Sequence, residues 1–130
     1  MSTVIFSEYV KHNNGHLYTC DINPNNIKNS KKFVKVGEKF VTFVVDDSIN
    51  FLKNFKINID FLYLDSLDGQ DPFSSEHQLK EIEASYLKLH KNSLVLLDDK
   101  GSKTKLSFNF LEKNNFKILN ETEEQVLFSL

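Results

Sequence analysis

Four short apolar runs, each followed by an acidic residue and then by a helix-start signal, constrain the fold of this chain most strongly. Apolar runs of this length bounded by turn residues are typical of buried strands. Strands that alternate with helices predict a mostly parallel sheet with helices on both faces, an α/β fold. The four runs are His16 to Asp21, Phe40 to Val45, Ile59 to Leu64 and Ser93 to Leu97.

Helical segments fill the intervals between these runs. Turn residues and caps mark several of their ends, such as Gly15 after the first helix and Asn23-Pro24 at the start of the second. The C-terminal part predicts two closing strands that form an antiparallel hairpin. The expected helices are Ser2 to His12, Pro24 to Lys35, a short one around Ile49 to Phe55, Ser74 to about His90, and Ser102 to Lys113; the closing strands are Phe116 to Leu119 and Gln125 to Leu130.

Composition narrows the class of protein. The 130 residues are enough for one core, and without linkers or repeats we expect a single domain over residues 1–130. The net charge is −2 and every basic residue except histidine is lysine, so neither nucleic acid nor an anionic membrane is an expected partner. No apolar run is long enough to span a bilayer. The single cysteine, Cys20, excludes an internal disulfide, and we expect a cytoplasmic protein.

The acids at the strand ends are the candidate functional residues. They are Asp21, Asp46-Asp47, Asp65 and Asp98-Asp99. Aspartate is common in turns and caps, so any one of them has about even odds of a purely structural role. Because parallel strands have their carboxyl ends at one edge, four such acids indicate an acidic rim suited to ribose hydroxyls, a cationic ligand or a divalent metal.

The order of segments resembles the class I S-adenosylmethionine-dependent methyltransferases, in particular the small-molecule O-methyltransferase-like branch. The resemblance covers nearly the whole chain. The stretches that carry it are STVIFSEYVK, GHLYTCDINPNNI, FVVDDSINFL, IDFLYLDSLDG, EHQLKEIEASYLKLHKNSLVLLDD and the closing NFKIL and QVLFSL.

The resemblance implies a cofactor, S-adenosylmethionine, and a small-molecule methyl acceptor. Residue by residue, it places Asp21 on the cofactor ribose and Asp47 with Ser48 against the adenine. It places Asp65 near the methyl donor or a metal. The implied cofactor-binding set is Ser2, Thr3, Asp21, Ile22, Asp47, Ser48 and Asp65; the implied catalytic set is Asp65, His77 and Asp99.

Two positions depart from the family pattern. The resemblance to metal-dependent members implies a divalent metal such as Mg²⁺ on Asp65 and Asp99. In those members the acid that matches Asp99 is followed by Asn, whereas Lys100 stands here, and its ammonium argues against that metal. The family's glycine-rich loop precedes its first helix, whereas this chain begins Met1-Ser2-Thr3. The resemblance therefore implies a sheet truncated at its N-terminus, which lacks the family's first strand.

Three functions remain open at this stage. The first is methyl transfer to a small-molecule acceptor, with oxygen as the expected methylated atom. The second is a catalytically impaired methyltransferase-like module that forms a homo-oligomer or accepts a partner chain to complete its sheet. The third is another nucleotide-binding α/β protein that uses Asp21 for ribose; it ranks last because it also needs a glycine-rich loop.

Overall fold

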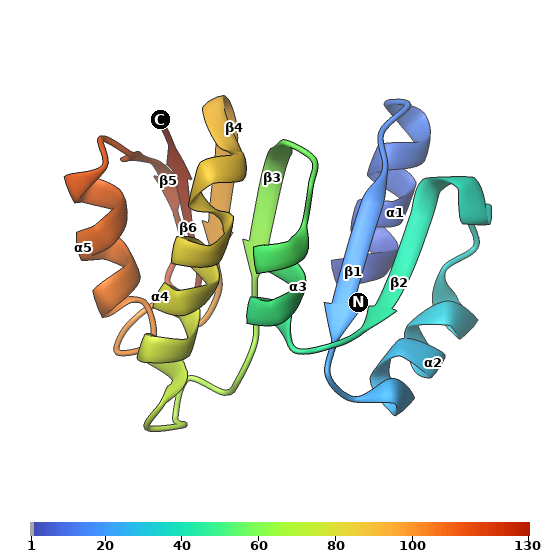
Figure 1. Cartoon of the computed structure of the whole chain (residues 1–130), viewed down its shortest axis with the longest axis horizontal. Coiled ribbons are helices and arrows are strands. Elements are labelled where there is room, and N and C mark those ends of the chain that lie inside the picture. The colour runs from blue at the N-terminus through green and yellow to red at the C-terminus, as the bar shows by residue number, and fades with distance from the viewer. Residues whose placement is uncertain (1) are drawn as a thin grey trace. The chain divides into compact units, whose positions relative to one another are not determined.

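The computed structural model describes residues 2–130 and divides the chain into two compact units (Figure 1). The first unit is Met1–Phe51 and the second is Leu52–Leu130. The division falls inside helix α3 (Ser48–Asn54). Each unit contains its own sheet, and we describe the two units separately.

The first unit is built on two parallel strands, β1 and β2, which pair from Leu17 opposite Val41 to Asp21 opposite Val45. Helices α1 and α2 both pack against β1 and contact each other. Both strands therefore run toward the same end of the unit, where Asp21 and Asp46 follow. The elements are α1 (Ser2–His12), β1 (Leu17–Asp21), α2 (Pro24–Phe33), a 3₁₀ turn (Glu38–Phe40) and β2 (Val41–Val45).

Local sequence signals account for the ends of these helices. After α1 the backbone enters a left-handed conformation at Asn14, and the amide of Gly15 donates to the carbonyl of Val10 over 2.8 Å. The side chain of Asn23 caps α2 by accepting from the amide of Asn25, and Pro24 occupies the first helical position.

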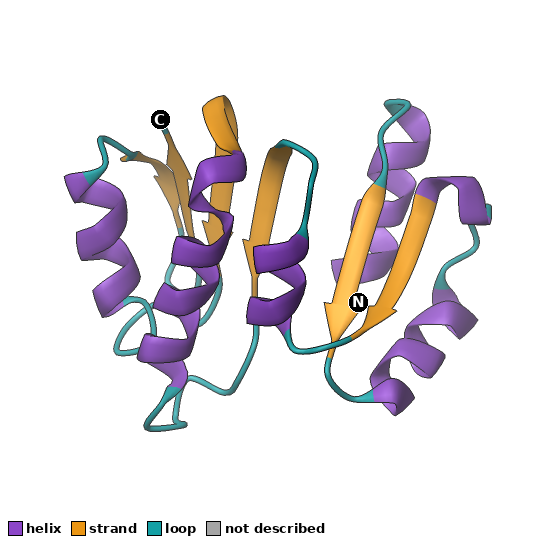
Figure 2. Ribbon diagram, viewed as in Figure 1, coloured by secondary structure: helices purple, strands orange, loops and turns teal. Residues whose placement is uncertain are grey.

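The second unit contains a four-stranded sheet in the order β3-β4-β6-β5. Strands β3 and β4 are parallel, whereas β6 is antiparallel to both β4 and β5. Helices α4 and α5 lie side by side over this sheet (Figure 2). The elements are β3 (Ile59–Leu64), α4 (Ser74–Ser85), a 3₁₀ turn (Tyr86–Lys88), β4 (Leu89–Leu97), α5 (Lys105–Lys113), β5 (Lys117–Glu121) and β6 (Val126–Ser129).

The core of the second unit lies between this sheet and α4 and α5. Alternate residues of β4 and β6 point into it, and this alternation fixes the antiparallel register of the two strands. The side chains that are completely buried are Ile82, Val95, Leu97, Leu111, Val126 and Phe128.

The predicted α/β architecture, the parallel pairs and the antiparallel C-terminal hairpin are confirmed. One prediction is wrong: α4 ends at Ser85, and Leu89 begins β4 instead of ending a helix. The apolar spacing that continues through Leu89 suggested more helix. Pairing with β3 decides otherwise, since Leu89 lies opposite Ile59 and the His90 ring bonds Asp60 over 2.6 Å.

Smaller boundary differences have similar causes. Helix α5 begins at Lys105, three residues later than Ser102, because the preceding residues form a turn in which Thr104 bonds the backbone of Gly101. Helix α2 ends at Phe33, two residues short of Lys35. None of the helices within residues 2–130 is long and apolar enough to cross a membrane.

Candidate active site

Acidic residues gather at the carboxyl ends of the strands within each unit, as the sequence predicts. In the first unit, Asp21 ends β1 and Asp46 follows β2, and the amide of Asp46 donates to the carbonyl of Asp21 over 3.2 Å. Burial, and then the Asp46 carboxylate, raise the pKa of the Cys20 thiol to about 11, with smaller contributions from Asp21 and Asp47. Three carboxylates therefore surround Cys20, and the thiol stays protonated at neutral pH.

The Asp21 carboxylate also has a local structural role. One oxygen accepts from the amide of Asn23 over 2.8 Å, and the other accepts from the side-chain amide of Asn26 over 3.1 Å. A carboxylate offers about four acceptor positions, so each oxygen retains capacity for a ligand hydroxyl. The turn into α2 thus holds the Asp21 carboxylate in place without using all of its hydrogen-bond acceptor positions.

The remaining residues predicted to bind cofactor in the first unit occupy loop and helix ends. Ser2 and Thr3 form the first turn of α1, which contains no acidic residue. Ile22 follows Asp21 and exposes 72% of its surface. Asp47 caps α3 by accepting from the amide of Asn50, and Ser48 is the first residue of that helix.

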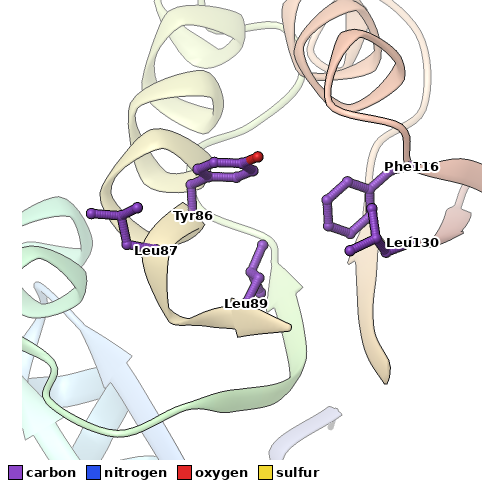
Figure 3. A pocket seen from close by; sticks show the side chains of 5 residues that line it. All are labelled: Tyr86, Leu87, Leu89, Phe116 and Leu130. Atoms are coloured by element: carbon purple, nitrogen blue, oxygen red, sulfur yellow. The ribbon is translucent and has the colours of Figure 1, made fainter. Parts of the chain in front are cut away.

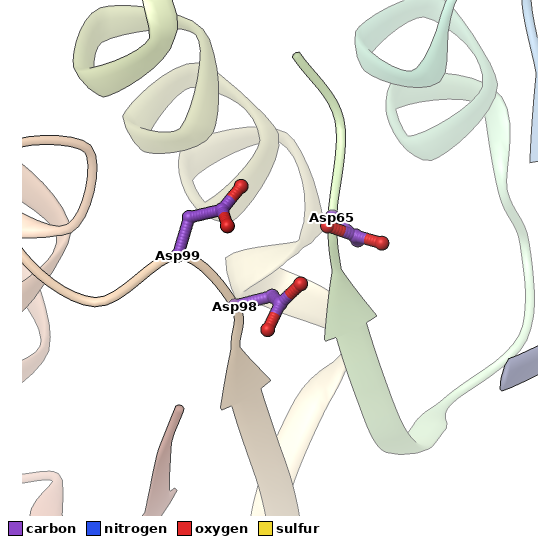
Figure 4. Close-up of side chains that lie close together, drawn as sticks. All are labelled: Asp65, Asp98 and Asp99. Carbon is purple, nitrogen blue, oxygen red and sulfur yellow. The ribbon is translucent and has the colours of Figure 1, made fainter. Parts of the chain in front are cut away.

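In the second unit three carboxylates come together at the ends of β3 and β4 (Figure 4). Asp65, Asp98 and Asp99 each offer an oxygen, and these oxygens lie within 4.8 Å of one another. The sequence predicts Asp65 and Asp99 as a pair, and the structure brings them together. Asp98 is among the acids at the predicted strand ends, but the resemblance gives it no role; parallel pairing of β3 with β4 places it beside Asp65.

The carboxyl groups of Asp65 and Asp98 act as a coupled pair. Burial, then a hydrogen bond to Asp98 and the negative charge of Asp98, raise the pKa of Asp65 to about 6. Burial opposes ionisation of Asp98, but hydrogen bonds from Asp65 and Gln125 outweigh it and lower the pKa of Asp98. The Gln125 amide donates to Asp98 over 3.0 Å. The pair therefore holds a proton on Asp65 in mildly acidic solution, while Asp98 stays ionised.

A buried cation, Lys103, completes this group. Its ammonium donates to the carbonyl of Leu67 over 2.8 Å and to Asp99 over 3.1 Å, and it lies 4.0 Å from an oxygen of Asp65. Lysine side chains are almost never fully buried, yet Lys103 is 1% exposed. The four-residue spacing from Asp99 was the available signal.

Lys100, by contrast, faces away from these carboxylates. Its ammonium pairs with Glu121 and donates to the carbonyl of Thr122 over 3.2 Å, at the turn between β5 and β6. The departure from the family pattern at Lys100 therefore places no charge among the acids. The cation beside them comes from Lys103.

His77 lies in the first turn of α4, beside a buried carboxylate. Its Nε2 atom is 3.9 Å from Glu81, whose side chain is 2% exposed. The Ser66 hydroxyl donates to the same Glu81 oxygen over 2.8 Å. Because Ser66 directly follows Asp65, Glu81 connects the residue after the acidic group with the helix that carries His77.

An apolar pocket lies at the opposite end of the second unit's sheet (Figure 3). Its lining residues are Tyr86, Leu87, Leu89, Phe116 and Leu130. Leu89 begins β4, whereas the acidic group follows the other end of that strand. Among the side chains that line the pocket only the Tyr86 phenol is ionisable, and the pocket is separate from the candidate site.

Parallel strands that end on acids, followed by an antiparallel hairpin, place this fold in the Rossmann-like α/β class. Residues 1–100 match the protein family described as "Methyltransferase domain". The chain therefore belongs to the class I S-adenosylmethionine-dependent methyltransferase family. Comparison with curated proteins gives no match.

Solved structures share this fold at low sequence identity. A protein from Clostridium thermocellum assigned as an rRNA methylase has a TM-score of 0.63 at 17% identity, over 89% of this chain and 75% of that one. A protein from Streptococcus mutans assigned as a methyltransferase, in complex with SAH, has a TM-score of 0.59 at 14% identity, over 88% and 75%. CalS11, a TDP-rhamnose 3′-O-methyltransferase of calicheamicin biosynthesis, has a TM-score of 0.58 at 16% identity, over 88% and 57%.

Proposed function

We propose that this protein transfers a methyl group from S-adenosylmethionine to an oxygen of a small molecule. The observation that carries the proposal is the Asp65–Asp98 pair, which provides a carboxyl group with a pKa of about 6 at the end of a parallel strand. A group with such a pKa serves well as a general base near neutral pH. The family match supplies the cofactor.

The first unit contains the residues that we assign to the cofactor. Asp21 would accept hydrogen bonds from the ribose hydroxyls, for which each of its oxygens has capacity. The exposed side chain of Ile22, after β1, suits the adenine, and Asp47 and Ser48 follow the neighbouring strand β2. The first turn of α1 contains Ser2 and Thr3, and the backbone amides at a helix N-terminus suit a carboxylate.

The second unit contains the residues that we assign to the acceptor. S-adenosylmethionine supplies an electrophilic methyl group. Asp65, once ionised, would accept the proton that the acceptor hydroxyl loses when its oxygen takes the methyl group. Asp99 and His77 lie on the segments beside Asp65 and would orient the hydroxyl. Methyl transfer requires positioning more than it requires covalent help from the protein.

Calorimetry with S-adenosylmethionine and SAH tests the cofactor assignment. We expect Asp21→Asn to weaken binding by about 10- to 150-fold, since a hydrogen bond to a charged acceptor is worth about 1.5–3 kcal/mol. Asp71→Asn is the matched control, because Asp71 also accepts an amide two residues later, that of Phe73, over 2.8 Å. Absence of binding to the folded wild-type protein at millimolar cofactor would refute the proposal.

Acceptor class needs a separate assay, because the structural neighbours include proteins assigned to rRNA and to a sugar nucleotide. The chain has a net charge of −2 and no arginine, which favours a small molecule over RNA. Transfer of a radiolabelled methyl group to a panel of hydroxylated small molecules, beside total RNA, distinguishes them. Labelling of RNA alone would overturn the small-molecule assignment.

A second function, assembly without catalysis, is favoured by unpaired strand edges. In the described chain β1 pairs with β2 alone and β3 pairs with β4 alone. In the first unit, α1 exposes Ile5 and Tyr9 by 67% and 65%. Such edges and apolar side chains suit a strand from a second copy or a partner chain. A monomer in light scattering at micromolar concentration would count against a homo-oligomer.

A further inference from the structure

We propose that Lys103 is a built-in cation that takes the place of a divalent metal among Asp65, Asp98 and Asp99. The inference goes beyond the proposed function and does not depend on it, since it concerns what neutralises these carboxylates. It rests on the contacts, the burial and the backbone conformation around the Lys103 ammonium.

The ammonium of Lys103 is directed at the two acids that a metal would need. It lies 3.1 Å from an oxygen of Asp99 and 4.0 Å from an oxygen of Asp65, and it donates to the carbonyl of Leu67 over 2.8 Å. The ligands of this ammonium are therefore all oxygens, two carboxylate and one carbonyl. Such oxygens are also the ligands that Mg²⁺ and Ca²⁺ prefer.

The Lys103 side chain is buried, so its contacts with the carboxylates belong to the packed interior of the second unit. Lys103 is 1% exposed, whereas Lys105, two residues later, is exposed. Removing a charge from water is costly unless oppositely charged and hydrogen-bonding groups surround it. A lysine is therefore buried at this position because the three carboxylates stabilise its charge.

The two residues that accept hydrogen bonds from Lys103 also have a strained backbone conformation. Both residues to which it donates have positive φ angles, 61° at Leu67 and 54° at Asp99. Non-glycine residues adopt this conformation at a cost, and surrounding contacts must hold them there. The loop packs tightly as well, since a Cβ at Gly69 would lie 3.3 Å from the Asp99 side chain. One ammonium thus connects the loop after β3 to the end of β4.

A divalent metal does not fit beside this ammonium. A Mg²⁺ ion bound to the Asp99 oxygen that contacts Lys103 would lie about 2.1 Å from that oxygen, and hence within about 5 Å of the lysine nitrogen. Two cations at that separation repel each other strongly in a partly buried site. The same carboxylate oxygens would also have to serve both. We therefore assign no step of the reaction to a metal.

Binding of Mn²⁺, followed by electron paramagnetic resonance of the free ion, tests the inference on the full chain. We expect the wild type and the control Lys105→Met to show no stoichiometric site. Lys103→Met leaves the carboxylates uncompensated and is expected to bind one Mn²⁺ at least about tenfold more tightly than the wild type, because cation repulsion is removed. Adding Asp99→Asn to Lys103→Met should abolish that site.

If Lys103→Met does not fold, a measurement on the wild-type protein alone still tests the inference. In nitrogen-15 NMR of lysine side chains, a hydrogen-bonded ammonium gives a slowly exchanging signal. We expect the Lys103 signal to persist unshifted in excess Mg²⁺, as should that of Lys88, whose ammonium donates to three carbonyls.

Stoichiometric Mn²⁺ binding by the wild type, lost in Asp99→Asn, would overturn the inference. So would a Lys103 signal that moves or disappears with Mg²⁺ while that of Lys88 does not. Neither measurement uses cofactor or acceptor. A failure of the inference about Lys103 is therefore distinguishable from a failure of the proposed methyl transfer.

Discussion

Replacing Asp65 with asparagine should change how the stability of this protein depends on pH. The pKa of the Asp65 carboxyl rises from its ordinary 3.8 to about 6, chiefly through burial and the hydrogen bond to Asp98. Between about pH 4 and pH 6 the folded protein holds a proton at Asp65 that the unfolded chain has lost. The free energy of unfolding therefore falls as the pH rises through this interval.

The magnitude follows from the size of the rise. A pKa change from 3.8 to about 6 corresponds to at most about 3 kcal/mol. Because the Asp65 side chain is 46% exposed, solvent screens much of this, and about 1 kcal/mol is the expected effect. This stabilisation is fully present below about pH 4 and is lost above about pH 6. The lowered pKa of Asp98 changes the free energy of unfolding only below about pH 4, outside the interval from pH 4 to pH 6.

Urea unfolding at several pH values from 4.5 to 7 measures the effect. Other titrating groups are common to both proteins, so the difference between wild type and Asp65→Asn isolates Asp65. That difference should change by about 1 kcal/mol over the interval, in favour of the variant as the pH rises. Asp98→Asn should flatten the wild-type dependence by removing the partner carboxylate. Parallel curves for wild type and Asp65→Asn would refute the coupling of the two acids.

Three further substitutions test the packing that supports the site. Lys88→Met should lower the free energy of unfolding by about 2 kcal/mol, because the ammonium caps the C-terminal carbonyls of both α3 and α4; Lys91→Met, at an exposed position, is the control. Gln78→Met should stabilise by about 1–3 kcal/mol, since the fully buried Gln78 amide has no hydrogen-bond partner among residues 2–130. Leu67→Gly should be neutral or stabilising by about 1 kcal/mol, because glycine tolerates the positive φ and the carbonyl to Lys103 is retained. Thermal and urea melts measure all three, and a sign opposite to the one given contradicts the contact concerned.

Much of the candidate site follows from local sequence signals. The position of Asp21 is predictable because an apolar run, an acid and the Asn23-Pro24 helix start occur in immediate succession. The same reasoning found Asp65 and Asp99 at strand ends, and parallel pairing brings these two together. Whether the acids bind cofactor and acceptor stays a prediction, and so does the single domain expected over residues 1–130.

Long-range contacts account for what the sequence did not predict. Spacing alone continued α4 to His90, but the pairing of Leu89 with Ile59 on a distant strand turns that segment into β4. Lysine side chains are almost never fully buried, yet the carbonyl of Leu67, 36 residues earlier, and the carboxylate of Asp99 enclose the ammonium of Lys103.

The amino-acid sequence by itself therefore determined which segments are strands and helices and where the acids fall along them, because caps, turns and apolar runs act over a few residues. The tertiary structure decided which acids share a proton and which lysine neutralises them. Those properties depend on burial and on distances between segments far apart in the chain, and no local pattern specifies either one.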